Sequence, residues 1–211
     1  MSWIDFFDEI YVLNLEKRED RLLEITSHFE EYQIPFKRIS AVEDSNGARG
    51  LRDTMVNVFN EAINKGYDNI LIFEDDAQFV VGKELVDDTM NKVVTQLPSN
   101  YLMCFLGGQP TGGYNSFYSA NLLPVVKYFS THSVAYSKQG IKEIMARNFD
   151  YPIDNWYVSD IQSLGNCYAI DPLLCTQRGG FSDIGHNEIN WTPFIVPKHQ
   201  QEINKLKSRA W

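Results

Sequence analysis

The sequence predicts a single α/β domain with a mostly parallel central sheet covered by helices. Short apolar segments alternate with amphipathic ones along the first half of the chain, and this alternation is typical of a parallel, doubly wound sheet. The length of 211 residues suits one such domain, and an apolar fraction of 44% is enough for a core without disulfides. We expect the domain to span residues 1–190 and a polar, basic tail to span 191–211.

Three strands and three helices are predicted in the first half. The strands are short apolar runs, whereas the helices carry apolar residues at helical spacing, as at Leu22, Ile25 and Phe29. The predicted strands cover residues 10–15, 36–42 and 69–73, and the predicted helices cover 16–33, 54–64 and 82–96. Residues 44–50 read Asp-Ser-Asn-Gly-Ala-Arg-Gly, which is typical of a loop.

The second half is predicted to continue the alternation with longer loops. A strand at 101–106 is followed by a glycine-rich stretch at 107–114, which either shapes a ligand pocket or is a plain connection. Further strands are expected within 125–136 and at 167–170, and further helices at 139–147 and 153–164. No internal repeat is present.

Charge and cysteine content exclude several classes of function. The net charge of −9 leaves no basic field, which argues against a nucleic-acid partner. An acidic protein can still bind a nucleotide where a metal ion supplies positive charge. The three cysteines form no CxxC pair, so the sequence indicates buried free thiols rather than a disulfide framework or a zinc site.

The N-terminal residues and the lengths of the apolar runs predict where in the cell the protein is located. The first nine residues contain three acids and no positive segment, and no apolar run approaches the roughly 20 residues that span a bilayer. We therefore expect a cytoplasmic protein. Four spaced cations between Lys198 and Arg209 make a weak patch, so a solvated C-terminal helix is favoured over membrane contact.

Three consecutive carboxylates, Glu74, Asp75 and Asp76, directly follow the predicted strand at 69–73. Parallel α/β sheets bind ligands beyond the carboxyl ends of their strands. Manganese and magnesium prefer such oxygen ligands and are often shared with substrate phosphates. In an extended chain Glu74 and Asp76 would share one side and Asp75 the other. The alternatives are a solvated acidic turn, or a metal site of a nuclease, phosphatase or nucleotidyltransferase.

Several further segments accompany this triplet in a fixed order. They are Tyr11–Arg21, Arg38–Glu43, Gly47–Leu51, Ile70–Ala77, Thr131–Ser137 with Gly140, Pro152–Asp154, and Gln177 with Ser182–Ile184. As an ordered set they resemble glycosyltransferase family 25, the lipooligosaccharide and procollagen galactosyltransferase type. The resemblance covers residues 11–184, most of the chain.

The resemblance implies a GT-A-like fold, a nucleotide-sugar donor, a divalent metal held by the acidic motif, and inversion at the anomeric carbon. The chain also departs from the family. Leu51 and Thr54-Met55 stand where members often carry Cys and then Ser-His, and Glu43 replaces an Asp. A histidine that does chemistry in relatives would be missing here.

The resemblance suggests which residues hold the metal and which hold the donor. We assign the metal to Asp76, with Glu74 and His186 as further ligands, and we expect manganese or magnesium. We expect Asn14, Arg18, Arg21, Asp75 and Gln177 to hold the donor. For Arg18 and Arg21 the alternative is a charge pattern on a helix surface, because pairs three and four residues apart are common there.

An inverting transfer needs a general base to take the proton of the acceptor hydroxyl. Asp154 is the first candidate, with a helix N-cap as its alternative role. Asp160 and Asp183 are further candidates. His132 is expected to be a satisfied interior histidine, with a metal ligand or a donor-phosphate contact as its alternative role. Trp156, Tyr157 and Trp191 are expected either to stack on a sugar ring or, for at least two of them, to pack in the core.

The acidic triplet and the family resemblance together imply an inverting, metal-dependent transferase of polysaccharide biosynthesis. It would move a hexose, galactose or glucose, from a UDP-sugar to a glycan or to a protein hydroxyl. Two alternatives remain: a catalytically degenerate relative that binds a sugar nucleotide or glycan, motivated by the missing Ser-His pair, and a different metal-dependent phosphoester enzyme.

Overall fold

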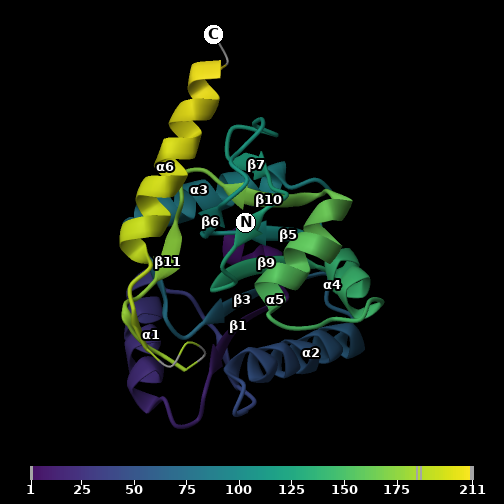
Figure 1. Cartoon of the computed structure of the whole chain (residues 1–211), viewed down its shortest axis with the longest axis vertical. Coiled ribbons are helices and arrows are strands. Elements are labelled where there is room, and N and C mark those ends of the chain that lie inside the picture. Colours follow the sequence, from purple (N-terminus) through teal and green to yellow (C-terminus); the bar gives the residue numbers. More distant parts are fainter. Residues whose placement is uncertain (1, 184, 186, 210–211) are drawn as a thin grey trace.

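The structure is a computed structural model that describes residues 2–183, 185 and 187–209. It confirms the predicted α/β class, with a seven-stranded central sheet flanked by helices (Figure 1). The strand order is β2-β1-β3-β9-β5-β10-β7. The bounds are β1 Glu9–Asn14, β2 Lys37–Ser40, β3 Asn69–Glu74, β5 Met103–Phe105, β7 Leu122–Pro124, β9 Ser133–Ser137 and β10 Cys167–Ile170.

The sheet is mostly parallel, as predicted. β1 pairs in parallel with both β2 and β3, and β5 pairs in parallel with β10. β9 lies antiparallel between β3 and β5, and β7 lies antiparallel at the edge beside β10. Five strands of this sheet therefore run in one direction and bring their carboxyl ends to one edge, where ligands bind in such folds.

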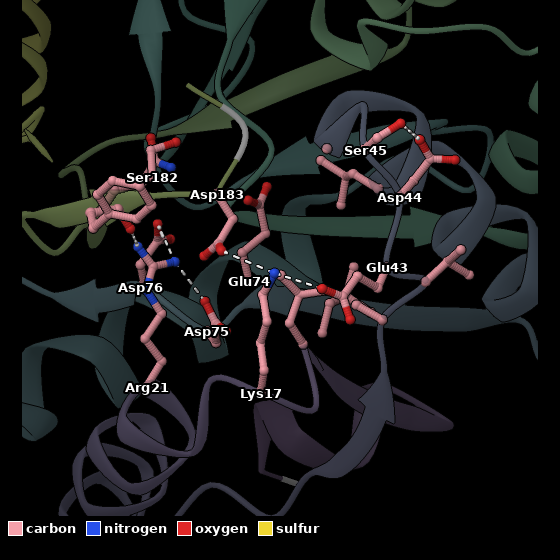
Figure 2. Close-up of a pocket in the computed structure, with 18 residues that line it drawn as sticks. Lys17, Arg21, Glu43, Asp44, Ser45, Glu74, Asp75, Asp76, Ser182 and Asp183 are labelled. Atoms are coloured by element: carbon pink, nitrogen blue, oxygen red, sulfur yellow. Dashed lines mark hydrogen bonds and ion pairs between the residues drawn. The ribbon is translucent and has the colours of Figure 1, made fainter. Parts of the chain in front are cut away.

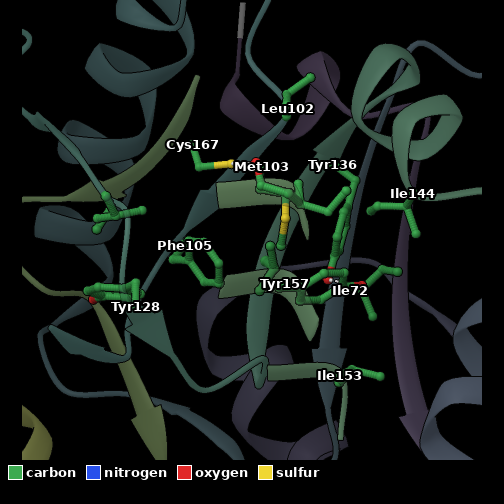
Figure 3. Close-up of a cluster of buried hydrophobic side chains, with 14 of the residues drawn as sticks. Ile72, Leu102, Met103, Phe105, Tyr128, Tyr136, Ile144, Ile153, Tyr157 and Cys167 are labelled. Atoms are coloured by element: carbon green, nitrogen blue, oxygen red, sulfur yellow. Dashed lines mark hydrogen bonds between the residues drawn. The ribbon is translucent and has the colours of Figure 1, made fainter. Parts of the chain in front are cut away.

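Helices cover both faces of the sheet, which explains the unbroken apolar runs of its strands. Along β3, Ile70 and Ile72 enter the core on one face, and Leu71 and Phe73 enter the core on the other. Burying a side chain of this size stabilises the fold by about 1.5–3 kcal/mol. Figure 3 shows the first of these cores, where Ile72 lies among Tyr136, Tyr157 and neighbouring side chains.

Different helices cover the two faces. The bounds are α1 Glu19–Tyr32, α2 Gly47–Lys65, α3 Lys83–Gln96, α4 Lys138–Met145, α5 Ile153–Trp156 and α6 Thr192–Arg209, with a short 3₁₀ turn at Trp3–Phe6. Buried residues of α2, α4 and α5 belong to the core around Ile72, and those of α1 and α3 belong to the core around Phe73. Two separate cores hold the sheet rigid beneath the edge where its strands end.

One sequence prediction about helices was wrong, and another was confirmed in extent but not in helix type. Residues 44–50 are not all loop, because α2 begins at Gly47, where the Asn46 side chain caps it by accepting from the Arg49 amide. The segment expected to be helical through residue 164 is helical throughout, as α5 to Trp156, a π-helical turn at Tyr157–Ile161 and a 3₁₀ turn at Gln162–Leu164. The polar run that was typical of a loop therefore contains a helix cap.

Short strands that the sequence did not indicate bring the C-terminal part of the chain to the sheet edge. β4 at Ala77–Phe79 pairs antiparallel with β11 at Cys175–Gln177, and β12 at Gly180–Ser182 pairs with β13 at Asn187–Ile189. A further two-residue pair joins β6 at Gln109–Pro110 to β8 at Tyr128–Phe129, and β8 lies within 125–136, where strands were predicted. These pairs surround the acidic triplet with residues from distant segments.

The stretch expected to be a polar tail contains the helix α6. Its residues Ile195, Ile203 and Leu206 are buried, and the latter two belong to the core on the α2 side. His199 of α6 is also buried, with the Tyr114 hydroxyl 2.8 Å from its Nδ1 and Asp171 Oδ1 3.3 Å from its Nε2. Within the described residues, no helix combines the length and apolarity needed to cross a bilayer.

Candidate active site at the carboxyl edge of the sheet

A cavity of about 460 Å³ opens beside the acidic triplet. Glu74 ends β3, and Asp75 and Asp76 form the turn that leads into β4. The ends of β1 and β2, the start of α2 and the strand β12 supply the other walls, as Figure 2 shows. We call it the first cavity; its size lies in the range of small-molecule sites.

The turn changes how the three carboxylates point. The Arg21 Nη1 group lies 2.9 Å from Asp75 Oδ1 and 3.3 Å from Asp76 Oδ2, so one guanidinium contacts both (Figure 2). Glu74 instead accepts a hydrogen bond from the Thr131 hydroxyl at 2.8 Å. The predicted alternation, with Asp75 apart from its two neighbours, does not hold because the chain turns at this point.

Asp75 uses both of its oxygens within the protein. Oδ1 accepts from Arg21, and Oδ2 accepts from Asn14 Nδ2 at 2.8 Å. Asn14 is buried; it also donates to the Arg18 carbonyl and accepts from Arg38 Nε at 3.1 Å. Asn14, which was predicted to contact the donor, donates to Asp75 and is not among the residues that line the first cavity. These contacts hold the turn in one conformation.

Asp76 is less well satisfied. Its Oδ1 atom is buried and has no hydrogen-bond partner among the described residues. Burial raises the pKa of Asp76 above its usual range, against the opposing effect of the Arg21 charge. Burial and the neighbouring Asp76 charge likewise raise the pKa of Glu74. Carboxyl groups whose pKa is raised by burial and by a neighbouring charge are typical of functional sites.

Basic residues at the start of α1 connect the turn to β12. Arg21 Nη2 donates to the Phe181 carbonyl at 2.7 Å, and Arg18 Nη1 lies 2.6 Å from Asp183 Oδ2. Lys17 lies 2.7 Å from Glu43 and 3.8 Å from Asp183. Of these cations Lys17 and Arg21 line the first cavity and Arg18 does not. Arg18, which was predicted to bind the donor, contacts the Phe181 carbonyl of β12 and Asp183 from the N-cap of α1.

A second cavity of about 480 Å³ adjoins the first. The two share Leu51, Glu74, Gln177 and Ser182 among their lining residues, so they meet at the acidic turn. Gln177, predicted to contact the donor, is thus placed where the two cavities join. The shared Leu51 is the residue that replaces the cysteine of the resembled family.

Asp154 lines the second cavity. Its alternative role as a helix N-cap is wrong, because Pro152 occupies the N-cap of α5 and Asp154 lies inside the helix. Oδ2 accepts from the Ser130 amide at 3.2 Å, whereas Oδ1 is buried with no partner among the described residues. Burial raises the pKa of this carboxyl. One oxygen is anchored and the other remains available to a ligand.

The other predicted residues lie in varied places. Asp183 lines the first cavity, whereas Asp160 lines neither and accepts a hydrogen bond from Ser159. His186 lies outside the described residues. His132 is interior as predicted, but neither ring nitrogen has a partner among the described residues, and burial lowers its pKa to about 4.

The three aromatic residues considered for sugar stacking, Trp156, Tyr157 and Trp191, differ in whether they lie in the core or line a cavity. Tyr157 is buried in the core, and Trp156 packs against that core beside Phe149, with ring centroids 4.9 Å apart. Trp191 instead lines the second cavity. Of the three aromatics singled out in the sequence, only Trp191 is in place to meet a ligand.

Sequence reasoning missed some residues of the site. Lys17 precedes α1 in the charged run 17–21, and Thr131 begins the segment Thr131–Ser137, but neither was predicted to belong to the site. Their signal is proximity in space: Lys17 follows β1 and Thr131 precedes β9, and both strands pair with β3, which ends at Glu74. Neighbouring strands in a sheet bring such residues together only once their order is known.

The donor set suits a hard divalent cation. Asp76 Oδ1 is a buried oxygen without a partner in the described part of the chain, and Glu74 lines the same cavity. No group of three or more His, Cys, Asp or Glu side chains is arranged to hold a metal within residues 2–183, 185 and 187–209. Magnesium and manganese sites often use only one or two carboxylates and complete their shell with phosphates and water.

No known family model matches the chain, and no curated protein matches its sequence. Solved structures similar to it include A197 from STIV, with 12% identity, a TM-score of 0.45, and coverage of 85% of this chain and 91% of that one. A glycosyltransferase involved in glycosylation of the major capsid of PBCV-1 has 15% identity, a TM-score of 0.46, and coverage of 72% and 74%.

A third similar structure is mannose-1-phosphate geranyltransferase from Thermus thermophilus, with 8% identity and a TM-score of 0.43. That match covers 79% of this chain and 60% of the other. All three TM-scores are below 0.5.

Proposed function

We propose that this chain is a metal-dependent, inverting glycosyltransferase that moves a hexose, galactose or glucose, from a UDP-sugar to an acceptor hydroxyl. The observation that supports this most is the pair of cavities that meet at Glu74 and Gln177. A transfer between two substrates needs both to be held in contact at one point. We further propose that the chain is a GT-A enzyme of glycosyltransferase family 25.

The first cavity suits a nucleoside diphosphate. Apolar residues at the ends of β1 and β2, Leu13, Leu15 and Val42, provide a surface for a base, and Lys17 and Arg21 provide positive charge for phosphates. The carboxylates of the turn lie beside these cations. A nucleotide sugar in this cavity would direct its sugar toward the junction with the second cavity.

Manganese or magnesium is the proposed cofactor. Asp76 and Glu74 would hold it, because Asp75 is already occupied by Arg21 and Asn14. When bound, the ion would stabilise the negative charge of the leaving diphosphate. Asp75 then acts as the residue that orients the turn. His186 remains the predicted additional ligand.

The chemistry is a single displacement. The acceptor oxygen forms a bond to the anomeric carbon of the donor while the bond from that carbon to the diphosphate oxygen breaks, and UDP leaves with the electron pair. The Asp154 carboxylate takes the proton of the acceptor hydroxyl through its unpartnered Oδ1. Attack from the face opposite UDP inverts the anomeric configuration.

The proposal is tested by measuring UDP release from UDP-galactose and UDP-glucose with Mn²⁺ present. We expect turnover by the wild type and a loss of about 100-fold or more in Asp76→Ala. Asp88→Ala is the control, because Asp88 is an exposed acid on α3 that pairs with Lys92. Unchanged turnover in Asp76→Ala would overturn the proposal.

Two other outcomes would favour the alternative functions. Tight UDP binding with no turnover across a wide set of acceptors would indicate a degenerate sugar-nucleotide-binding protein. Cleavage of simple phosphodiesters, with no greater stabilisation by UDP than by phosphate in thermal melts, would indicate a different phosphoester enzyme.

A further inference from the structure

The two cavities differ in the charge of their walls. Lys17 and Arg21 line the first cavity. Among the described residues no Lys or Arg lines the second, whose only charged lining groups are the carboxyls of Glu74 and Asp154. The Asp154 carboxyl, which has no cationic side chain beside it among the lining residues and is not a proposed metal ligand, repels phosphate and other anions at short range. The second cavity therefore disfavours a nucleotide or a phospholipid headgroup as its ligand.

The uncharged walls of the second cavity are rich in groups that both donate and accept hydrogen bonds. Gln109, Thr111, Ser130 and Thr131 contribute an amide and three hydroxyls, and Gln177 adds a second amide. Neutral amide and hydroxyl groups of this kind can form hydrogen bonds with the hydroxyls of a sugar. The volume of about 480 Å³ also falls within the usual range for small-molecule sites.

Trp191 gives this cavity an apolar wall. The side chain is 38% exposed. A ligand that covered this exposed apolar area would gain binding free energy from its burial. Its flat face suits the C–H face of a sugar ring. The nearby Phe194 is 65% exposed and lies edge-on to the indole at 6.2 Å, but it does not line the cavity.

The backbone holds Trp191 firmly despite that exposure. The Trp191 carbonyl accepts from the amides of Phe194 and Ile195, both at 2.9 Å, at the start of α6. The next residue, Thr192, donates through its hydroxyl to the Gln177 carbonyl at 2.9 Å. The backbone that carries Trp191 is thus held beside Gln177, at the junction of the cavities, so little backbone order has to be gained on binding.

We infer that the second cavity binds a neutral saccharide as the acceptor and that Trp191 is the residue on which its ring stacks. The inference rests on the proposed function, because it identifies the acceptor of that transfer. The sugar lies with its apolar face against the indole and one hydroxyl toward Asp154 Oδ1. Trp191 is accordingly a binding residue that determines acceptor class.

The test uses the full chain with a UDP-sugar donor, Mn²⁺, and lactose and the methyl glycosides of galactose and glucose as acceptor probes, beside a serine-containing peptide. In Trp191→Ala we expect the acceptor KM to rise about tenfold or more, with a donor KM within about twofold of the wild type. Trp191→Phe keeps an aromatic face and should recover most of the loss. Phe194→Ala is the matched control and should change neither KM by more than about twofold.

Several results would overturn the inference. They are an unchanged acceptor KM in Trp191→Ala, an equal rise in Phe194→Ala, or transfer to the peptide but to no saccharide. Donor hydrolysis without acceptor separates this failure from a failure of the proposed function. If the wild type hydrolyses the donor but fails these tests, only the assignment of the acceptor is wrong. If the wild type neither hydrolyses the donor nor transfers the sugar, the proposed transferase function is wrong as well.

Discussion

Two glutamates of this domain are in opposite electrostatic states. Glu61, on α2, accepts hydrogen bonds from Lys37 at 2.7 and 2.9 Å and pairs with Lys65 at 2.8 Å. Hydrogen bonds from Lys37 and Lys65 lower its pKa to about 2. Glu74, at the end of β3, has the Thr131 hydroxyl as its partner, and burial with the nearby Asp76 raises its pKa.

The difference shows which carboxylates the fold satisfies by itself. Glu61 has two cations and needs no ligand, whereas one guanidinium, that of Arg21, serves both Asp75 and Asp76. Among the described residues, Asp76 Oδ1 and Asp154 Oδ1 are buried without partners. Keeping such groups costs stability, and proteins retain this cost where function requires it.

The strongest way to sharpen the comparison is to remove the unpaired charge of the second cavity. Asp154→Asn keeps the size and the anchoring oxygen but cannot take a proton. We expect the transfer rate to fall by about 10²–10⁴-fold, with UDP affinity in Mn²⁺ little changed. Asp160 lies outside both cavities. The transfer rate of Asp160→Asn should therefore stay within about twofold of the wild-type rate. Equal losses in the two variants would contradict the assignment of the base.

Arg21 is the next most informative position. Arg21→Met leaves Asp75 and Asp76 without their shared cation in a largely buried turn, so we expect unfolding free energy to fall by about 3 kcal/mol in urea titrations. Arg147→Met breaks a more exposed pair with Glu143 and should cost less than about 1 kcal/mol. A similar loss of unfolding free energy in both variants would show that Arg21 stabilises the turn no more than an ordinary surface ion pair does.

The same substitution at the two glutamates should act with opposite signs. Glu74→Gln removes a buried negative charge but keeps an oxygen for the Thr131 hydroxyl. We expect it to raise the unfolding free energy, measured without divalent cations, by about 1 kcal/mol or more and to lower turnover. A less stable Glu74→Gln protein would mean that the charge at this position is already compensated.

Glu61→Gln should give the smallest effect, a loss of about 1 kcal/mol or less at pH 7, with turnover unchanged. Because the pKa of Glu61 is about 2 in the folded chain, against an ordinary value of 4.5, the unfolded chain binds more protons between these values. The stabilisation is therefore present above pH 4.5 and is lost as the pH falls toward 2. Urea titrations at pH 3 and 7 should show a smaller difference for Glu61→Gln than for the wild type.

The fold was predictable where a segment carries its own signal. The run at 69–73 is apolar because both of its faces are buried, and the amphipathic spacing of α1 and α3 reflects helices that cover the sheet. The strands β4 and β11 were missed because each has three residues and exists only through the other, nearly 100 positions away. Such pairing depends on the tertiary fold.

The site was partly predictable for the same reason. A strand that ends in three carboxylates indicates the sheet edge and a ligand, and the structure brings Asp75, Asp76, Arg21 and Asp183 to one cavity. The direction of each side chain was not predictable, because it depends on the turn at Asp75 and on Arg21, which comes from another helix. The alignment of Trp191 with the second cavity depends on contacts between β11 and α6.

The central claim is that Asp76 and its neighbours hold a divalent cation that in turn holds a nucleoside diphosphate. Calorimetric titration of UDP, with and without Mn²⁺, tests it directly on the wild type, Asp76→Asn and the control Asp88→Asn. We predict that Mn²⁺ tightens the Kd for UDP by about tenfold or more in the wild type and in Asp88→Asn, and does not in Asp76→Asn. A wild-type Kd for UDP that does not change with Mn²⁺ would contradict the claim. So would an Asp76→Asn protein whose Kd for UDP tightens with Mn²⁺ as much as that of the wild type.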